Sequence, residues 1–240
     1  MKRRAAILFE GSSSATGLFD EQRQGGFAGR IVSHYDAYNE MTCLGIKQDP
    51  HWVFTHRHSQ PDLQPAEIAD SLGGHVREIH RRSVHTLLGI FVIGIQSDYD
   101  VYRFGEQKAL NSWINGISQL GDTIASHRIE PLFMTSPRYS ITTPLGIPAV
   151  HNPELHKTYL SYLKGLAYGL EAPLLSFEQA MGGTLAEFGA MDRRHVTASG
   201  HEAVANFLLP ILDSKLNISN NPVAEEQLKA FALKTSAEIF

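Results

Sequence analysis

The chain has a single cysteine, Cys43, so it cannot form a disulfide bond within itself, and a reducing compartment fits this composition. It also lacks any stretch near the roughly 18 apolar residues that a membrane-spanning helix requires. The apolar run at residues 5–9 is too short for the core of a signal peptide, and Glu10 ends it. We therefore expect a soluble, cytoplasmic protein without a membrane span.

An excess of charge of one sign is missing as well. The formal net charge is −4, so there is no general basic field that would attract nucleic acid. Apolar residues make up 42% and charged residues 19% of the 240 positions, which is typical of one globular domain. No internal repeat interrupts this composition, and we expect no nucleic acid partner.

Short apolar runs alternate along the chain with helical patterns. Strands are predicted at residues 5–9, 87–95, 130–137 and 172–177, with a further strand possible within 35–43. Helices are predicted at residues 27–32, from Pro65 to a break at Gly73-Gly74, at 110–124, at 155–170 and from Gly200 onward. This alternation predicts a three-layer α/β/α sandwich with a mostly parallel, five-stranded sheet of the flavodoxin-like type.

Polar segments follow several predicted strands at one edge of this sheet. "GSSSATG" (residues 11–17) comes directly after the first strand, and other polar stretches follow Ile95 and Ser136. Ligands of parallel α/β sheets bind at the carboxyl ends of the strands. We therefore expect the functional site on this rim.

The segment "MDRRHVTASGH" (residues 191–201) places Asp192 and His195 three positions apart before the last predicted helix. A carboxylate in such a loop can hold an imidazole in the tautomer that accepts a proton from a serine hydroxyl. Ser199 and Glu202 have the spacing of a capping box, which predicts that the helix begins at Gly200.

These segments together resemble the SGNH/GDSL hydrolase family, from about residue 5 to residue 213. Members of this family carry a Gly-Asp-Ser motif after the first strand and Asp-x-x-His before the final helix, which "DRRHVTASGH" matches. Gly11 then corresponds to the glycine of the first motif, Ser12 replaces its aspartate, and Ser13 takes the place of its nucleophilic serine. Gly17 matches a later glycine of the family.

The resemblance implies a serine hydrolase that cleaves or transfers an acyl ester through an acyl-enzyme intermediate. On this pattern Ser13 attacks the acyl carbonyl, His195 accepts and returns its proton, and Asp192 orients the imidazole. The implied substrate is a small-molecule acyl ester. The family needs neither a metal nor an organic cofactor, and we expect none.

The oxyanion hole departs from the family pattern. The family uses the backbone N–H of the serine, a glycine after the second strand and an asparagine after the third. Here the candidates are Ser13, Gly45 and Gln96, and a different alignment puts Gln48 at the glycine position. Gln96 can donate through its side-chain amide, although it is one methylene longer than asparagine.

Histidines gather in "HWVFTHRHSQPD" (residues 51–62). An H-x-H pair such as His56 and His58 can place two imidazoles on one side of a strand, where they can bind zinc, but Asp62 is the only carboxylate near the pair in the sequence. We interpret the segment as a polar surface loop, and three later histidines as a solvated helix face: His75, His80 and His85.

The end of the chain is predicted to be separate from this domain. We expect a catalytic domain over residues 1–215, followed by a linker and a C-terminal helix over residues 216–240, which begins at Pro222. That helix could support a homodimer.

Two other functions remain open on these residues. The altered oxyanion positions and the serine at position 12 also suit a non-catalytic binding protein on the same fold. Alternatively, "GSSSATG" could cradle a phosphate or nucleotide through backbone N–H groups at a helix start. It has neither the Gly-Lys-Ser/Thr ending nor the Gly-x-Gly-x-x-Gly pattern of established phosphate loops.

Overall fold

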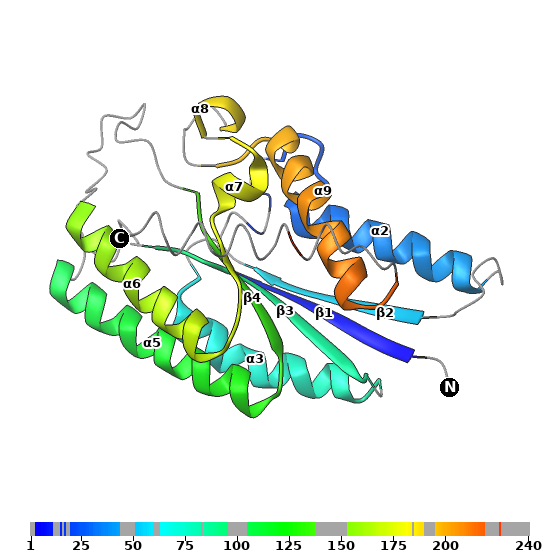
Figure 1. Cartoon of the computed structure of the whole chain (residues 1–240), viewed down its shortest axis with the longest axis horizontal. Coiled ribbons are helices and arrows are strands. Elements are labelled where there is room, and N and C mark those ends of the chain that lie inside the picture. Colours follow the sequence, from blue (N-terminus) through cyan, green and yellow to red (C-terminus); the bar gives the residue numbers. More distant parts are fainter. Residues whose placement is uncertain are drawn as a thin grey trace.

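The computed structural model describes residues 3–11, 15, 17, 20–43, 51–59, 63–82, 84–95, 105–137, 153–183, 185–189, 195–218 and 226. Within them, five strands form one sheet in which every pair is parallel, in the order β2-β1-β3-β4-β5 (Figure 1). The strands are β1 (Arg3–Gly11), β2 (His51–Ser59), β3 (Thr86–Ile93), β4 (Glu130–Thr135) and β5 (Leu174–Leu175).

Helices cover both faces of the sheet, which confirms the predicted three-layer α/β/α architecture (Figure 1). One face carries α2 (Gly26–Cys43) and α9 (Ala198–Lys215). The other carries α3 (Pro65–His80), α5 (Glu106–Ser126) and α6 (Pro153–Gly169). The short helices α7 (Phe177–Met181) and α8 (Leu185–Phe188) lie between β5 and α9 in the chain.

The side chains of β1 alternate between two cores. Ile7 and Phe9 pack on the α2/α9 side, whereas Ala6 and Leu8 pack on the α3/α5 side. Successive residues of a strand point to opposite faces, so a strand covered on both faces is apolar throughout. The same holds for β3, where every residue from Leu87 to Ile93 is buried.

Residues 35–43 do not form a strand, contrary to our expectation. They continue the helix that begins at Gly26, because Tyr35 and Tyr38 repeat the helical spacing of Phe27 and Ile31 and join the same core. The second strand is instead β2, which we had interpreted as a surface loop. It lies at the edge of the sheet, where polar side chains are tolerated.

The expected break at Gly73-Gly74 is also wrong. Helix α3 runs without interruption from Pro65 to His80, and its buried residues Leu72, Val76 and Ile79 continue one apolar stripe past the two glycines. A glycine pair costs roughly 2 kcal/mol of helix propensity, which the burial of several large side chains offsets.

The described part of the chain contains no helix with the length and apolar character that crossing a bilayer demands. At the C-terminal side, Leu216 is buried and Ile218 packs against the core, with the N–H of Ile218 donating to the carbonyl of Asp213. The predicted helix that begins at Pro222 lies outside the described residues, apart from Glu226, and the division at residue 215 stays a prediction.

Candidate active site

The carboxyl end of β1 approaches β3 so closely that its last residue must be glycine. At Gly11 the backbone φ is +152°, and a Cβ atom would lie 2.4 Å from the carbonyl oxygen of Val92, its register partner. Any side chain there would push the two strands apart. The close packing of β1 against β3 therefore explains why a glycine precedes the serine run.

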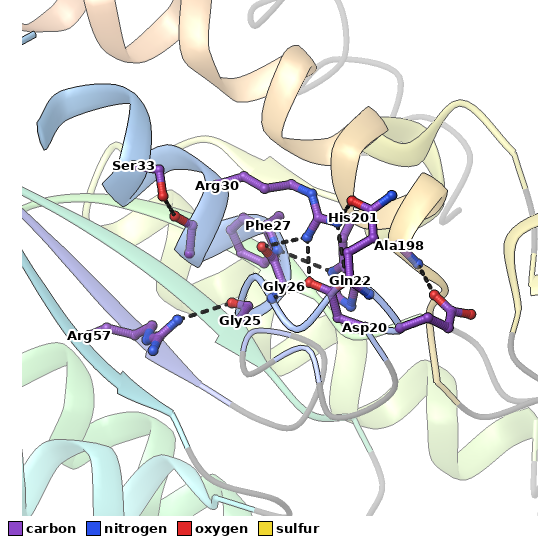
Figure 2. A network of polar contacts seen from close by, with 12 residues as sticks. Asp20, Gln22, Gly25, Gly26, Phe27, Arg30, Ser33, Arg57, Ala198 and His201 are labelled. Atoms are coloured by element: carbon purple, nitrogen blue, oxygen red, sulfur yellow. Dashed lines mark hydrogen bonds and ion pairs between the residues drawn. The ribbon is translucent and has the colours of Figure 1, made fainter. Parts of the chain in front are cut away.

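Asp20 and Arg30 hold residues 20–26, which lead into α2, in a tight loop (Figure 2). The Arg30 guanidinium donates to both carboxylate oxygens, with Nη1 2.5 Å from Oδ2 and Nη2 3.1 Å from Oδ1. The same carboxylate accepts from the N–H groups of Gln22 and Gly26, at 3.2 and 3.1 Å. The hydrogen bond from Arg30 lowers the pKa of Asp20, whose side chain is fully buried, so the carboxylate stays ionised.

The last helix is attached to this loop at two points near its amino end (Figure 2). The Glu21 carboxylate accepts from the N–H of Ala198 at 2.8 Å, and the N–H of Phe27 donates to Nδ1 of His201 at 3.2 Å. Burial lowers the pKa of His201 to about 4, which keeps its ring neutral and able to accept. The start of α9 therefore lies against the loop that follows β1.

His195 lies three positions before the first residue of α9 and is half-buried. The adjacent Val196 forms an antiparallel bridge with Gly189, and the N–H of Thr197 donates to the carbonyl of Phe188 at 2.8 Å. These backbone contacts fix the segment of His195 between the end of α8 and the start of α9.

The capping box that we expected at Ser199 and Glu202 is wrong. Helix α9 begins at Ala198 with Thr197 as its N-cap, and the Thr197 side chain accepts no hydrogen bond from a backbone N–H of the first turn. The Thr197 hydroxyl instead donates to the carbonyl of Phe188. The acceptor that the first turn needs comes from Glu21, 177 positions earlier in the chain, rather than from a neighbour in sequence.

A second polar cluster lies at the end of β1, on the α3 side of the sheet. Glu10 and His58 are register partners on adjacent strands, so their side chains share a face. The Glu10 carboxylate is completely buried, with Oε2 2.9 Å from Nδ1 of His58 and Oε1 2.8 Å from Nδ1 of His75 on α3. Burial raises the pKa of Glu10 to about 9 and lowers that of His75 to about 4.

This cluster corrects our interpretation of two histidines. His58 lies on a strand rather than in a surface loop, and His75 faces a buried carboxylate rather than solvent. His80 is exposed at the end of α3, as expected, whereas His85 is exposed just before β3 and not on the expected helix face. One signal in the sequence was the H-x-H spacing of residues 56 and 58, and another was Glu10 at the end of an otherwise apolar strand.

A pocket with a volume of about 240 Å³ opens between the first turns of α3 and α5. These turns follow β2 and β3, so the pocket lies at the same edge of the sheet as the end of β1. The indole N–H of Trp113 donates to the carbonyl of Gly94 and ties α5 to the end of β3. The residues that line the pocket are Gln64, Pro65, Ala66, Glu67, Ala109, Ser112 and Trp113.

No protein-family model matches the chain, and neither does any curated protein sequence. Solved structures do match it. The esterase EstA from Pseudoalteromonas sp. superposes with a TM-score of 0.56 over 88% of this chain and 98% of its own, at 16% identity. A protein from Parabacteroides merdae described as a GDSL-like lipase reaches 0.57 over 86% and 94%, at 12% identity. This chain has the GDSL-type fold.

The acetylxylan esterase Axe2 from Geobacillus stearothermophilus agrees, with a TM-score of 0.54 over 87% of this chain and 95% of its own, at 16% identity. Each match spans nearly the whole of the solved structure, so the fold that the sequence resemblance implied is confirmed.

The structure describes three of the residues that the GDSL resemblance singled out: Gly11, Gly17 and His195. Gly11 ends β1, and His195 precedes α9. Gly17 has φ +68°, and a Cβ atom on it would lie 2.1 Å from the backbone nitrogen of Gly26, so it packs against the start of α2. The other predicted site residues lie outside the described residues: Ser13, Gly45, Gln96 and Asp192.

Proposed function

We propose that the chain is an ester hydrolase of the GDSL type, with Ser13 as nucleophile, His195 as general base and Asp192 as the group that orients the imidazole. The observation that carries this proposal is the attachment of α9 to the segment that leads into α2, through Glu21–Ala198, and to the start of α2 itself, through Phe27–His201. A triad needs its serine and histidine to converge although they are 182 positions apart in the chain. Both contacts support that convergence, because they hold the start of α9, which follows His195 in the chain, against residues 21–27, which follow Ser13.

The chemistry follows from the proposed roles. The Ser13 hydroxyl oxygen attacks the acyl carbonyl carbon while His195 takes the hydroxyl proton. The tetrahedral intermediate then expels the alcohol, which receives that proton from His195 and leaves the acyl group on Ser13. A water molecule releases the acid by the same two steps, or a second alcohol accepts the acyl group instead.

The oxyanion is proposed to bind the backbone N–H of Ser13, the N–H of Gly45 and the side-chain amide of Gln96. The close approach of Gly11 to Val92 supports this set in part, because it brings together the strand ends that lead to Ser13 and Gln96. Loss of one such donor costs roughly 10²–10³ in kcat. Gln96→Ala is therefore expected to lower kcat by about that factor and leave KM within a few-fold.

The proposed substrate is a small-molecule acyl ester, and the proposed reaction needs no cofactor. The sequence leaves the acyl length, the alcohol and the choice between hydrolysis and transfer open. The predicted cytoplasmic location and the homodimer through residues 216–240 stay predictions.

A fluorophosphonate probe tests the nucleophile, because it forms a covalent bond with an activated serine. We expect one labelled site in the wild type and none in Ser13→Ala. Ser12→Ala and Ser14→Ala are matched controls, since they change the neighbouring serines of the same run. Equal labelling of Ser13→Ala, or an unlabelled wild type, contradicts the proposal.

Hydrolysis of short acyl nitrophenyl esters tests the general base. His195→Ala is expected to lower kcat by about 10³-fold or more. His85→Ala, which changes an exposed histidine just before β3, should leave kcat unchanged. Wild-type turnover no faster than that of His195→Ala would instead favour a binding protein with this fold.

A further inference from the structure

The apolar side chains of β1 that face α3 are followed in the same row by a carboxylate. Ala6 and Leu8 belong to the apolar core on this side, and the next residue in the row is Glu10. Its carboxylate is completely buried, at a position where an aliphatic side chain would complete the core. A polar group buried at such a position is costly unless other groups or an ion bind its oxygens.

The described ion-pair partners of this carboxylate are two imidazoles, and neither ring supplies a permanent charge. Both rings direct Nδ1 at the carboxylate, at 2.9 Å for His58 and 2.8 Å for His75. Two imidazoles and one carboxylate are a donor set that binds a divalent cation. From this arrangement we propose that Glu10, His58 and His75 bind one divalent cation of the zinc class.

The geometry suits this ligand set. One donor atom from each of the three residues lies within 4.8 Å of the other two. Donor atoms around a tetrahedral zinc ion, with bonds of about 2.1 Å, are roughly 3.4 Å apart. The imidazole nitrogens now lie 2.8 and 2.9 Å from the carboxylate oxygens, so small side-chain rotations open the space for the ion. Two imidazoles and one carboxylate favour zinc, cobalt or nickel over magnesium or calcium.

The cation can enter from solvent. The side chains of His58 and His75 are 22% and 19% exposed, although the carboxylate beneath them is buried. The ring of His56 lies on the same face of β2, with its centroid 4.4 Å from that of His75. Three protein ligands leave a fourth position, which water or His56 can fill.

The three ligands come from three elements, namely β1, β2 and α3. A bound cation therefore ties the end of β1 to its edge strand and to the helix that covers both. Glu10 directly precedes Gly11 and the serine run, so the cation would brace the strand end from which that run departs. This binding site does not depend on the proposed hydrolase activity.

Metal binding to the full chain is the decisive measurement. After removal of metal with a chelator, titration with Zn²⁺ should show one high-affinity equivalent by calorimetry. At a hundredfold excess over Kd the Tm should rise by roughly 5–10 °C. Substitution with Co²⁺ should give the visible absorption of a cobalt ion bound by nitrogen and oxygen donors.

Glu10→Gln and His75→Asn are expected to weaken Zn²⁺ binding by about 100-fold or more, since changes even to groups behind metal ligands cost 10–100-fold. His80→Asn and His85→Asn change exposed histidines and serve as matched controls. Circular dichroism and the Tm of each metal-free variant distinguish lost ligands from lost folding.

Three results would overturn the assignment. Wild-type binding no tighter than that of folded His75→Asn, or an equal loss of binding in His80→Asn, would indicate adventitious surface binding. Retained binding in folded Glu10→Gln together with a complete loss in His56→Asn would remove Glu10 from the ligand set.

Discussion

The backbone N–H of Phe27 donates to Nδ1 of His201 across 174 residues of sequence and joins α2 to the first turn of α9. The imidazole is 1% exposed and stacks on the ring of Phe27, with centroids 6.5 Å apart. An accepting Nδ1 has no proton, so this contact exists only with the neutral ring. Protonation of His201 would place an uncompensated donor against another donor.

The stability of the fold should therefore depend on pH through His201. Burial lowers its pKa in the folded chain to about 4, against about 6.5 when unfolded. The stabilisation is fully present above pH 6.5 and is lost as the pH falls towards 4, because only the unfolded chain takes up the proton in that range. The free energy of unfolding should fall by roughly 1–2 kcal/mol more between pH 7.5 and pH 5 in the wild type than in His201→Asn.

Urea denaturation at several pH values measures this difference. In His201→Asn the side-chain oxygen can still accept from Phe27 but does not titrate in this range. His80→Asn, which changes an exposed histidine, should keep the pH dependence of the wild type. Parallel curves for wild type and His201→Asn would contradict the prediction. Other histidines with a lowered pKa contribute equally to both chains and cancel.

The pair Asp20–Arg30 should show strong coupling in a double-mutant cycle. Both side chains are largely buried, and removal of one partner leaves the other charge without compensation. Asp20→Ala and Arg30→Ala are each expected to cost about 3–5 kcal/mol of unfolding free energy, and the double variant much less than their sum. Chemical denaturation of the four chains provides the cycle. Additive single effects would show that the pair is not coupled.

The buried helices and strands could be predicted from the sequence because their burial leaves a periodic pattern. Strand β3 is continuously apolar, and α5 repeats large residues on one face, from Trp113 to Ile124. The strand predicted within residues 35–43 was wrong. Tyrosine favours strands locally, whereas the packing of Tyr35 and Tyr38 against the core favours the helix. Polar β2 gave no alternating apolar signal because it is the edge strand.

Only residues that are close in sequence could suggest a candidate site, and the roles of Ser13, Asp192 and His195 stay a prediction. Asp192 and His195 form a recognisable local motif, whereas the attachment of α9 through Glu21 depends on a contact over 177 positions. The cluster of Glu10, His58 and His75 is likewise assembled from positions 48 and 65 residues apart. No local spacing encodes such a cluster, since the strand register and the position of α3 create it.

Gly17→Ala and Gly165→Ala should change stability in opposite directions. A Cβ atom on Gly17 would lie 2.1 Å from the backbone nitrogen of Gly26, and φ there is +68°. Gly17→Ala is expected to destabilise the fold by at least about 1–3 kcal/mol. Gly165 is exposed within α6 and has nothing within 4 Å of a new Cβ, so Gly165→Ala should stabilise by about 0.5–1 kcal/mol. Thermal unfolding of both variants measures the signs, and a neutral Gly17→Ala would contradict the close packing.

Glu21 should affect catalysis more than stability, if the proposed triad is right. Its carboxylate accepts from the N–H of Ala198, three positions after His195, and so positions the segment that carries the general base. Glu21→Ala is expected to lower kcat about 10-fold or more with KM nearly unchanged, because small displacements of a catalytic group are costly. Glu21→Gln keeps an accepting oxygen and should retain most of the rate. Asp36→Ala, on the exposed face of α2, should have no effect on kcat.

Steady-state kinetics with a nitrophenyl ester, together with the Tm of each variant, tests whether Glu21 acts on catalysis or on folding. Equal rates for Glu21→Ala and wild type would mean that the contact does not position His195, and a rate loss that merely follows the Tm would assign Glu21 to folding alone.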